Sequence, residues 1–411
     1  MTEITTMVNF NLLRERTICY DLEGFRPVEI TEGLLKSQGV DYPISDQVKQ
    51  DLKSGYEWFS ALYDNHALMP VKHYREIHCD PEEELEVHNY TGICPTNVLE
   101  VSPSRGSCAV GCQYCLVTDG KQVKDIELYA NYCEKLANSL ERNKDRAIYY
   151  YFSPKTEAFS ETHLWNGMAH DIMRTFVAHF RKYPDSRCRI FIASKGGPEH
   201  FGVTDKGETI FDIMGQIPDK IQVNGSVGIM PQYLRDILEP NAASIDERMQ
   251  TLVECRRRGI FAESVLCQPL FLPYLTWETV DEQMGIFADA GVKNIKPEFF
   301  TAEIRNLVLV AQYINHYDPE KLGEFFYPYL KEDNLGHIKQ RSRLAPDRSV
   351  CAEKLAMIKK AAMGHGITIS LCNWVKREIG SVAEWVGDAD RESAAEGYRC
   401  LGYQTRLFGK L

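Results

Sequence analysis

The 411-residue sequence lacks any run of eighteen apolar residues, and its first residues contain neither a basic stretch nor an apolar one. These absences argue against a membrane span and a secretory signal, so we expect a cytoplasmic protein with no membrane partner. Positive charge is also scarce, because 47 Lys and Arg stand against 58 Asp and Glu, giving a formal net charge of -11. An acidic chain repels polyanions, which disfavours nucleic acid as the main partner.

Internal repeats and low-complexity tracts are absent as well, so the organisation has to come from hydrophobic periodicity. From about residue 97, short apolar runs alternate with amphipathic stretches of helical period, a rhythm typical of βα units. This predicts an α/β fold, specifically a partial (β/α)6 TIM-like barrel. Strands are expected at 97–101, 147–153, 188–194, 220–227, 260–269 and 292–299, and helices near 122–142, 162–182, 206–216, 244–258 and 277–290.

The rhythm also suggests domain boundaries. Residues 1–95 do not follow it and are interpreted as an N-terminal extension, and residues 96–317 form the predicted core barrel. Residues 318–411 contain a helical segment at 351–364 and an apolar run at 367–372, and we interpret them as a C-terminal capping region.

Thirteen cysteines in a chain without an export signal are expected to be reduced thiols. Cys108, Cys112 and Cys115 form a Cys-x3-Cys-x2-Cys loop directly after the first predicted strand, with Gly106 and Gly111 allowing tight turns. Three thiolates can hold three irons of a [4Fe–4S] cluster and leave the fourth iron open. The alternatives are a zinc site or three incidental thiols, although no second Cys-x2-Cys pair completes a four-ligand zinc site.

At this loop the sequence resembles the radical S-adenosylmethionine (SAM) superfamily, over roughly residues 95–300. The resemblance implies that Cys108, Cys112 and Cys115 hold a [4Fe–4S] cluster, that SAM chelates the open iron, and that Tyr114 lies near the adenine. It further implies one-electron cleavage of SAM to methionine and a 5′-deoxyadenosyl radical that abstracts hydrogen from substrate. An electron donor such as flavodoxin or ferredoxin is then a partner.

Three more segments resemble the spore photoproduct lyase-like branch of that superfamily. A Thr-Asp-x-aromatic segment is matched at 156–161 with Glu157 in place of Asp, and a Thr/Ser-Lys pair is matched at 194–195. A Glu-Pro-x-Ala-x-Ser-x-x-x-Arg segment is matched at 239–248. The resemblance implies that the residues around SAM or substrate are Ser153, Thr156, Glu157, Lys195, Ser226 and Arg248.

Each of these residues also has an ordinary structural interpretation. Lys195 could be a solvated lysine at a strand end, and Arg248 could lie on an exposed helix face beside Asp246 and Glu247. Ser153 and Ser226 could be plain turn hydroxyls. Position decides between the interpretations, because a barrel builds its site at the carboxyl ends of its strands.

Three cysteines lie outside the predicted barrel, namely Cys351, Cys372 and Cys400. An auxiliary cluster is one interpretation, but their spacing lacks the tight pairs of common auxiliary-cluster domains. Buried structural thiols are favoured, and a hydrogen-donating thiol is a third interpretation.

The sequence thus favours a radical SAM enzyme that acts on a small polar metabolite, such as a nucleoside, sugar or amino-acid-like compound. Epimerisation, dehydrogenation, rearrangement and carbon–carbon bond formation all stay open as outcomes, in a setting of natural-product biosynthesis. Two alternatives stay open: a lyase-like photolesion repair enzyme, and a non-catalytic iron–sulfur or zinc protein. The acidic charge weighs against the first.

Overall fold

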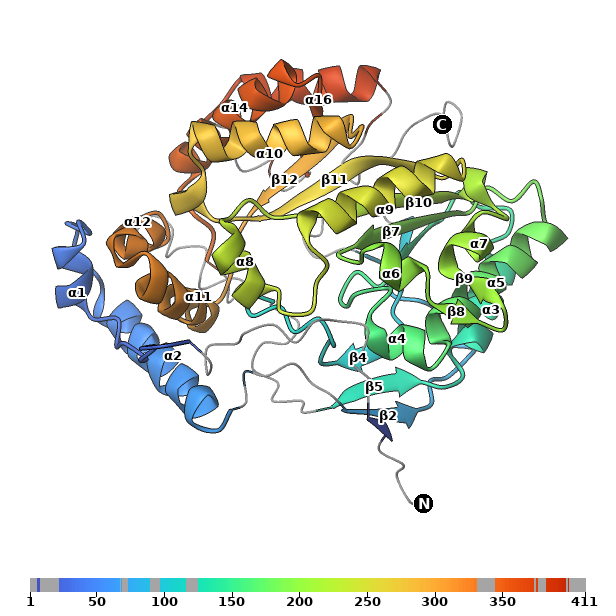
Figure 1. Cartoon of the computed structure of the whole chain (residues 1–411), viewed down its shortest axis with the longest axis horizontal. Coiled ribbons are helices and arrows are strands. Elements are labelled where there is room, and N and C mark those ends of the chain that lie inside the picture. Colours follow the sequence, from blue (N-terminus) through green and yellow to red (C-terminus); the bar gives the residue numbers. More distant parts are fainter. Residues whose placement is uncertain are drawn as a thin grey trace.

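The main feature of the computed structural model is a parallel seven-stranded sheet with the order β13-β12-β11-β10-β7-β6-β3 (Figure 1). The structure describes residues 6–7, 22–66, 68, 73–88, 97–115, 125–330, 344–372, 375, 382–396 and 398. The strands of the sheet are β3 (Val98–Val101), β6 (Tyr149–Phe152), β7 (Arg189–Ser194), β10 (Ile221–Ser226), β11 (Phe261–Leu270), β12 (Asn294–Phe299) and β13 (Thr368–Ile369).

Helices connect these strands and cover the sheet, and α10, α14 and α16 lie together near β12 and β13 (Figure 1). The helices are α1 (Glu32–Ser37), α2 (Asp46–Asp64), α3 (Tyr132–Arg142), α4 (Glu161–Trp165), α5 (Met168–Lys182), α6 (Pro198–Phe201), α7 (Ile210–Met214), α8 (Gln232–Leu238), α9 (Ile245–Arg257), α10 (Trp277–Asp289), α11 (Ile304–Tyr317), α12 (Leu322–Phe326), α14 (Arg348–Gly364) and α16 (Trp385–Ala395). Within the described residues, none of them combines the length and apolar composition of a membrane-spanning segment.

All six strands predicted from the sequence are confirmed, and they pair in chain order. The helix predicted at 244–258 is confirmed as α9. Its capping box is formed because the Ser244 hydroxyl accepts from the Glu247 amide at 3.2 Å, while the Glu247 carboxylate accepts from the Ser244 amide at 2.7 Å. The helix predicted at 277–290 is confirmed as α10.

Three helix predictions were partly wrong. The stretch 122–142 contains the strand β5 (Ile126–Tyr129) before α3, and residues 122–124 lie outside the described part. The stretch 162–182 is broken into α4 and α5 at Gly167, whose φ of 75° is easy only for glycine. The stretch 206–216 begins with the hairpin of β8 (Thr204–Asp205) and β9 (Glu208–Thr209) and becomes helical only in α7.

A second, smaller sheet was not predicted. Its order is β1-β2-β5-β4, with β1 (Thr6–Met7), β2 (His73–Ile77) and β4 (Ser104–Gly106). The strand β4 begins the cysteine loop, and it pairs antiparallel with β5, which in turn pairs parallel with β2. The N-terminal region therefore supplies two strands, β1 and β2, to the sheet that anchors the cysteine loop.

The two faces of the large sheet differ in chemistry. On the helix-covered face, Tyr150, Phe152 and Val223 join the largest apolar cluster of the chain. The opposite face, which we call the inner face, carries the rings of Tyr149 and Tyr151 and the buried amides of Gln222 and Asn224. Alternation of side chains along each strand produces this division.

The terminal regions pack on the same body. Helix α2 lies against α11, where a β-carbon at Gly55 would stand 3.0 Å from the Val308 methyl, so glycine allows the close approach. The predicted C-terminal helix is confirmed as α14, and the apolar run at 367–372 contributes β13. The domain boundaries at 95 and 317 stay predictions.

Candidate functional site

The cysteine loop leaves β4 and folds tightly at the carboxyl end of β3. Gly106 and Gly111 have φ values of 83° and 66°, as the need for tight turns predicted. The Gly111 amide donates to the Cys108 carbonyl at 3.1 Å, and the Cys115 amide donates to the Cys112 carbonyl at 3.1 Å. The three cysteines are thus carried on two consecutive backbone turns.

The thiols of this loop lie in largely buried surroundings. Burial raises the pKa of Cys108 to about 12, while backbone amides of Glu157 and Val110 act in the opposite direction. Burial also raises the pKa of Cys112, against the effect of the Lys195 cation. No three His, Cys, Asp or Glu side chains among the described residues are placed to share one metal ion. A cubane differs from a single ion because each thiolate binds its own iron, so the donor set fits a cluster of that type.

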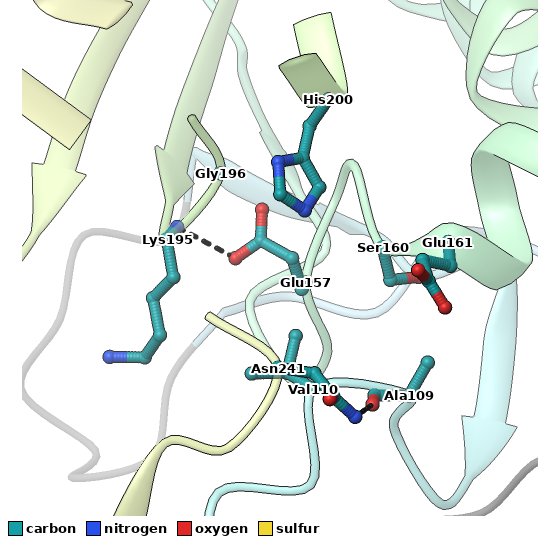
Figure 2. Close-up of a pocket in the computed structure, with 9 residues that line it drawn as sticks. All are labelled: Ala109, Val110, Glu157, Ser160, Glu161, Lys195, Gly196, His200 and Asn241. Carbon is teal, nitrogen blue, oxygen red and sulfur yellow. Dashed lines mark hydrogen bonds between the residues drawn. The ribbon is translucent and has the colours of Figure 1, made fainter. Parts of the chain in front are cut away.

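The end of α8 and the segment that follows it hold the cysteine loop through hydrogen bonds. The Gln113 amide donates to the Leu238 carbonyl at 2.9 Å. Asn241 contacts the loop twice, since its backbone amide donates to the Val110 carbonyl at 3.3 Å and its side-chain amide donates to the Ala109 carbonyl at 2.9 Å (Figure 2). The loop is therefore held through its own backbone amides and carbonyls.

Glu239 is the centre of the buried ion network beside the loop. Its carboxylate is 2.9 Å from the Lys195 ammonium and 2.5 Å from an Arg248 nitrogen, and it accepts a hydrogen bond from the Tyr114 hydroxyl. Burial alone would raise the pKa of Glu239, but Arg248, Lys195 and Arg235 together hold that pKa well below its usual range. Glu239 is therefore ionised and orients the groups around it.

Arg248 is buried, with 1% of its surface exposed, so the interpretation that it lies on an exposed helix face is wrong. Its guanidinium donates to Glu239, to the Ser226 carbonyl at 2.7 Å and to the Ala243 carbonyl at 2.8 Å. These bonds make Arg248 a residue that positions Glu239 and Ser226.

Lys195 follows directly after β7, and its side chain is only 14% exposed. Its ammonium donates to Glu239 and, at 3.2 Å, to the Ser226 hydroxyl, so the interpretation of a simply solvated lysine is wrong. The same ammonium lies 5.7 Å from the centre of the Tyr114 ring. An ammonium has three donors, so these two bonds leave one for an incoming acceptor.

Glu157 is placed on the other side of Lys195, in a small pocket shown in Figure 2. Its carboxylate accepts from the Ser194 hydroxyl at 2.5 Å and from the Lys195 amide at 2.8 Å. Burial raises its pKa, partly offset by those hydrogen bonds. His200 lies in the same pocket, and its Nδ1 accepts from the Gly197 amide at 3.1 Å. Glu157 thus fixes the backbone at the end of β7, from which the Lys195 side chain extends.

Ser153 and Thr156 lie between β6 and Glu157 and carry buried hydroxyls without a hydrogen-bond partner in the described structure. Ser153 also has a φ of 52°, a strained conformation for a residue with a β-carbon. Unpaired buried hydroxyls are costly, and they mark positions where a bound ligand would supply the partner. The sequence prediction of these two residues as site residues stays a prediction.

Two residues of the site were not assigned a role from the sequence. Glu239 stands in a matched motif, but nothing in the pattern indicates that three donors converge on it. His163 bridges two parts of the site, since its Nε2 is 2.9 Å from the Ser104 hydroxyl and its Nδ1 is 3.0 Å from the Glu157 carbonyl. A single histidine in an amphipathic segment gives no signal for such a bridge.

Two of the three cysteines outside the predicted barrel, Cys351 and Cys372, are among the described residues. Cys351 is buried, and burial raises its pKa, as expected for a structural thiol. Cys372 is partly buried, and Cys400 lies outside the described residues. The auxiliary-cluster interpretation stays untested.

Comparison with known proteins gives only distant structural matches. No protein family model matches the chain, and no curated protein matches it. Among solved structures, SuiB of Streptococcus suis bound to S-adenosylmethionine is similar at 10% identity and a TM-score of 0.33, covering 69% of this chain and 52% of SuiB. SuiB bound to precursor peptide SuiA is similar at 11% identity and a TM-score of 0.36, covering 75% of this chain and 57% of SuiB. The chain therefore spans little more than half the length of the structures it matches.

Proposed function

We propose that this protein is a radical SAM enzyme that binds a [4Fe–4S] cluster through Cys108, Cys112 and Cys115 and binds SAM beside it. The observation that carries the proposal is the position of the three-thiol loop. It lies at the carboxyl end of a parallel sheet, next to an oriented ammonium on Lys195 and two unpaired hydroxyls on Ser153 and Thr156. These groups suit a ligand that has both a carboxylate and an amine.

When bound, the reduced cluster would supply one electron to the sulfonium of SAM, giving methionine and a 5′-deoxyadenosyl radical that takes a hydrogen atom from the substrate. The residues of the chain itself would bind and orient SAM. Lys195 would donate its third N–H to the carboxylate of SAM, and Glu239 would hold the ammonium in place. Tyr114, whose hydroxyl is engaged with Glu239, would offer only its ring to the adenine.

The proposed architecture around this site is a partial (β/α)6 barrel. The order of its six parallel strands along the sheet follows the order in the chain, with helices in the connections, and this supports the proposal.

Two alternatives are weaker. Photolesion repair, which the lyase-like motifs suggest, requires a basic surface, whereas the chain has a net charge of -11. A zinc or electron-transfer protein does not require the Lys195, Glu239 and Arg248 network beside the thiols. A small polar metabolite of the nucleoside, sugar or amino-acid-like type as substrate, a flavodoxin or ferredoxin as electron donor, and a cytoplasmic location are further parts of the proposal.

The test is an anaerobic assay of the reconstituted and dithionite-reduced protein with SAM. We expect 5′-deoxyadenosine from the wild type and from a Cys133→Ala control, and none from Cys112→Ala. Iron analysis should give about four irons per chain, or about eight if an auxiliary cluster is present. A zinc-only protein, or equal product from Cys112→Ala, would refute the proposal.

A further inference from the structure

A groove lies between α2 and α11, which pack side by side (Figure 1). Its volume is about 440 Å³, within the range of roughly 300–1,000 Å³ that is typical of small-molecule sites. The wall formed by α2 carries Asp51, Ser54, Gly55 and Trp58. These residues follow the spacing i, i+3, i+4 and i+7, so they share one face of the helix. No residue that lines the groove belongs to the proposed SAM site, so a ligand bound here would occupy a separate site.

The groove also has an apolar lining that is fixed in place. Ile304 and Leu344 contribute it, and both side chains are buried. The backbone of Leu344 pairs with that of Ala302 in both directions, with N–H···O distances of 2.7 and 3.0 Å. Small-molecule sites usually combine such an apolar lining with a few polar groups that set the specificity. The groove has this composition, because its remaining side chains are aromatic or polar.

Trp58 and Asp51 give the two ends of the α2 wall different chemistry. The two residues are seven positions apart, which is about 10 Å along the helix axis. Trp58 is half-buried, and the Arg305 guanidinium of the opposite wall lies 5.6 Å from the centre of its ring. The indole offers a flat apolar surface. The groove therefore has an aromatic end and a carboxylate end.

The charges that line the groove do not cancel. Arg305 does not make the groove basic, because its guanidinium is 3.0 Å from the Glu303 carboxylate and the two charges offset each other. Asp51 forms no ion pair with the described residues, and its carboxylate accepts only from the Gln47 side chain, at 2.9 Å through Oδ1. Two carboxylates and one guanidinium line the groove, which leaves one net negative charge at the Asp51 end.

We propose that this groove is a binding site for an organic amine, a ligand with an ammonium at one end and an apolar or aromatic body at the other. An ammonium has three N–H donors, which suit the Asp51 carboxylate and the Ser54 hydroxyl one helical turn away. The body of the ligand would lie against Ile304 and Leu344 and reach Trp58. The net charge of -11 on the chain also favours a cation over an anion. The inference does not depend on the proposed function.

Binding is tested on the full-length protein by saturation-transfer NMR titration with three probes that share one body. The probes are 4-phenylbutylamine, 4-phenylbutan-1-ol and 4-phenylbutyrate. We expect the amine to bind, the alcohol to bind about threefold or more weakly, and the carboxylate to bind weakest.

Three variants locate the binding site. Asp51→Asn should weaken binding of the amine by about three- to fivefold and leave binding of the alcohol unchanged. Trp58→Ala should weaken binding of both probes by about threefold or more. Glu57 lies on the same helix, is 62% exposed and does not line the groove. Glu57→Gln is therefore the matched control and should bind the amine as the wild type does.

Several results would overturn the inference: no binding of the amine, equal or tighter binding of the alcohol or the carboxylate, or equal losses in Asp51→Asn and Glu57→Gln. A competition experiment separates the groove from the proposed SAM site, because SAM also carries an amine. Saturating SAM should leave the dissociation constant of 4-phenylbutylamine unchanged, whereas displacement would place the probe beside the cysteine loop and refute the groove. Production of 5′-deoxyadenosine is measured separately, so its absence refutes only the radical SAM function.

Discussion

The Lys195 ammonium lies 2.9 Å from a Glu239 carboxylate oxygen, although the two residues come from the ends of different strand and helix segments. Glu239 in turn contacts Arg248 at 2.5 Å and accepts from Tyr114, so one carboxylate joins the cysteine loop, β7 and α9. Because Glu239 is fully buried and ionised, the position of Lys195 depends on it.

Replacing the Glu239 carboxylate should therefore destabilise the protein. We expect Glu239→Gln to lower the free energy of unfolding by about 3 kcal/mol, because Lys195 and Arg248 keep their charges but lose their buried counter-ion. Urea unfolding measures the change. The exposed Glu199 provides a control, and Glu199→Gln should alter the free energy by less than about 0.5 kcal/mol. Equal stability of the two variants would contradict the role of Glu239.

The Tyr114 hydroxyl offers a narrower test of the same network. Tyr114→Phe removes one hydrogen bond to a buried carboxylate and should cost about 2 kcal/mol of unfolding free energy. Tyr183 donates to Glu141 at 2.6 Å on the surface, so Tyr183→Phe should cost much less. Iron content should be unchanged in both. A loss of iron in Tyr114→Phe would indicate that the hydroxyl acts on the cluster loop instead.

Lys195 should affect the affinity for SAM and not the iron content. Lys195→Met removes the donor that we assign to the SAM carboxylate, and we expect the dissociation constant of SAM to rise by about tenfold or more. Isothermal titration on the cluster-loaded protein measures it. Lys206, which is largely exposed and pairs with Asp171 at 3.0 Å, provides the control Lys206→Met. Unchanged SAM affinity in Lys195→Met would rule out the assignment.

Stability should fall as the medium becomes acidic, through two buried histidines. Burial lowers the pKa of His163 and of His200 to about 4 each, compared with about 6.5 in an unfolded chain. Between these values the unfolded state binds more protons, so stability is lost as pH falls from about 6.5 towards 4, by an amount on the order of 3 kcal/mol for each histidine. Urea unfolding at pH 7 and pH 5 tests this, and His163→Gln should flatten the dependence. An unchanged slope in that variant would contradict the assignment.

The contact between α2 and α11 gives a packing prediction. At Gly55 a β-carbon would stand 3.0 Å from the Val308 methyl and 3.3 Å from the Arg305 α-carbon, so Gly55→Leu should destabilise the protein by about 1–3 kcal/mol. Gly364, at the end of α14, has open space around it, and Gly364→Ala should be neutral or slightly stabilising. Thermal unfolding measures both, and the midpoint should fall in Gly55→Leu and stay the same or rise slightly in Gly364→Ala.

Much of the parallel sheet was predictable because its strands are continuous apolar runs, such as Tyr149–Phe152, all four residues of which are buried. The cysteine loop was predictable because its spacing is local in the sequence. The convergence of Tyr114, Lys195 and Arg248 on Glu239 was not predictable, since it depends on segments far apart in the chain. The strand β5 was missed because Ile126–Tyr129 is short and runs directly into a helix.

The small sheet has a consequence for how the chain reaches its folded state. Tyr74 of β2 is paired with Ile126 of β5, so the strand that anchors the cysteine loop is paired across a long stretch of sequence. Such non-local pairing is slow to form, and a chain shortened to begin after β2 would leave the edge of β5 unpaired. An open edge invites pairing between molecules. Protein expressed without its N-terminal region should therefore tend to aggregate, even though every cysteine of the loop is present.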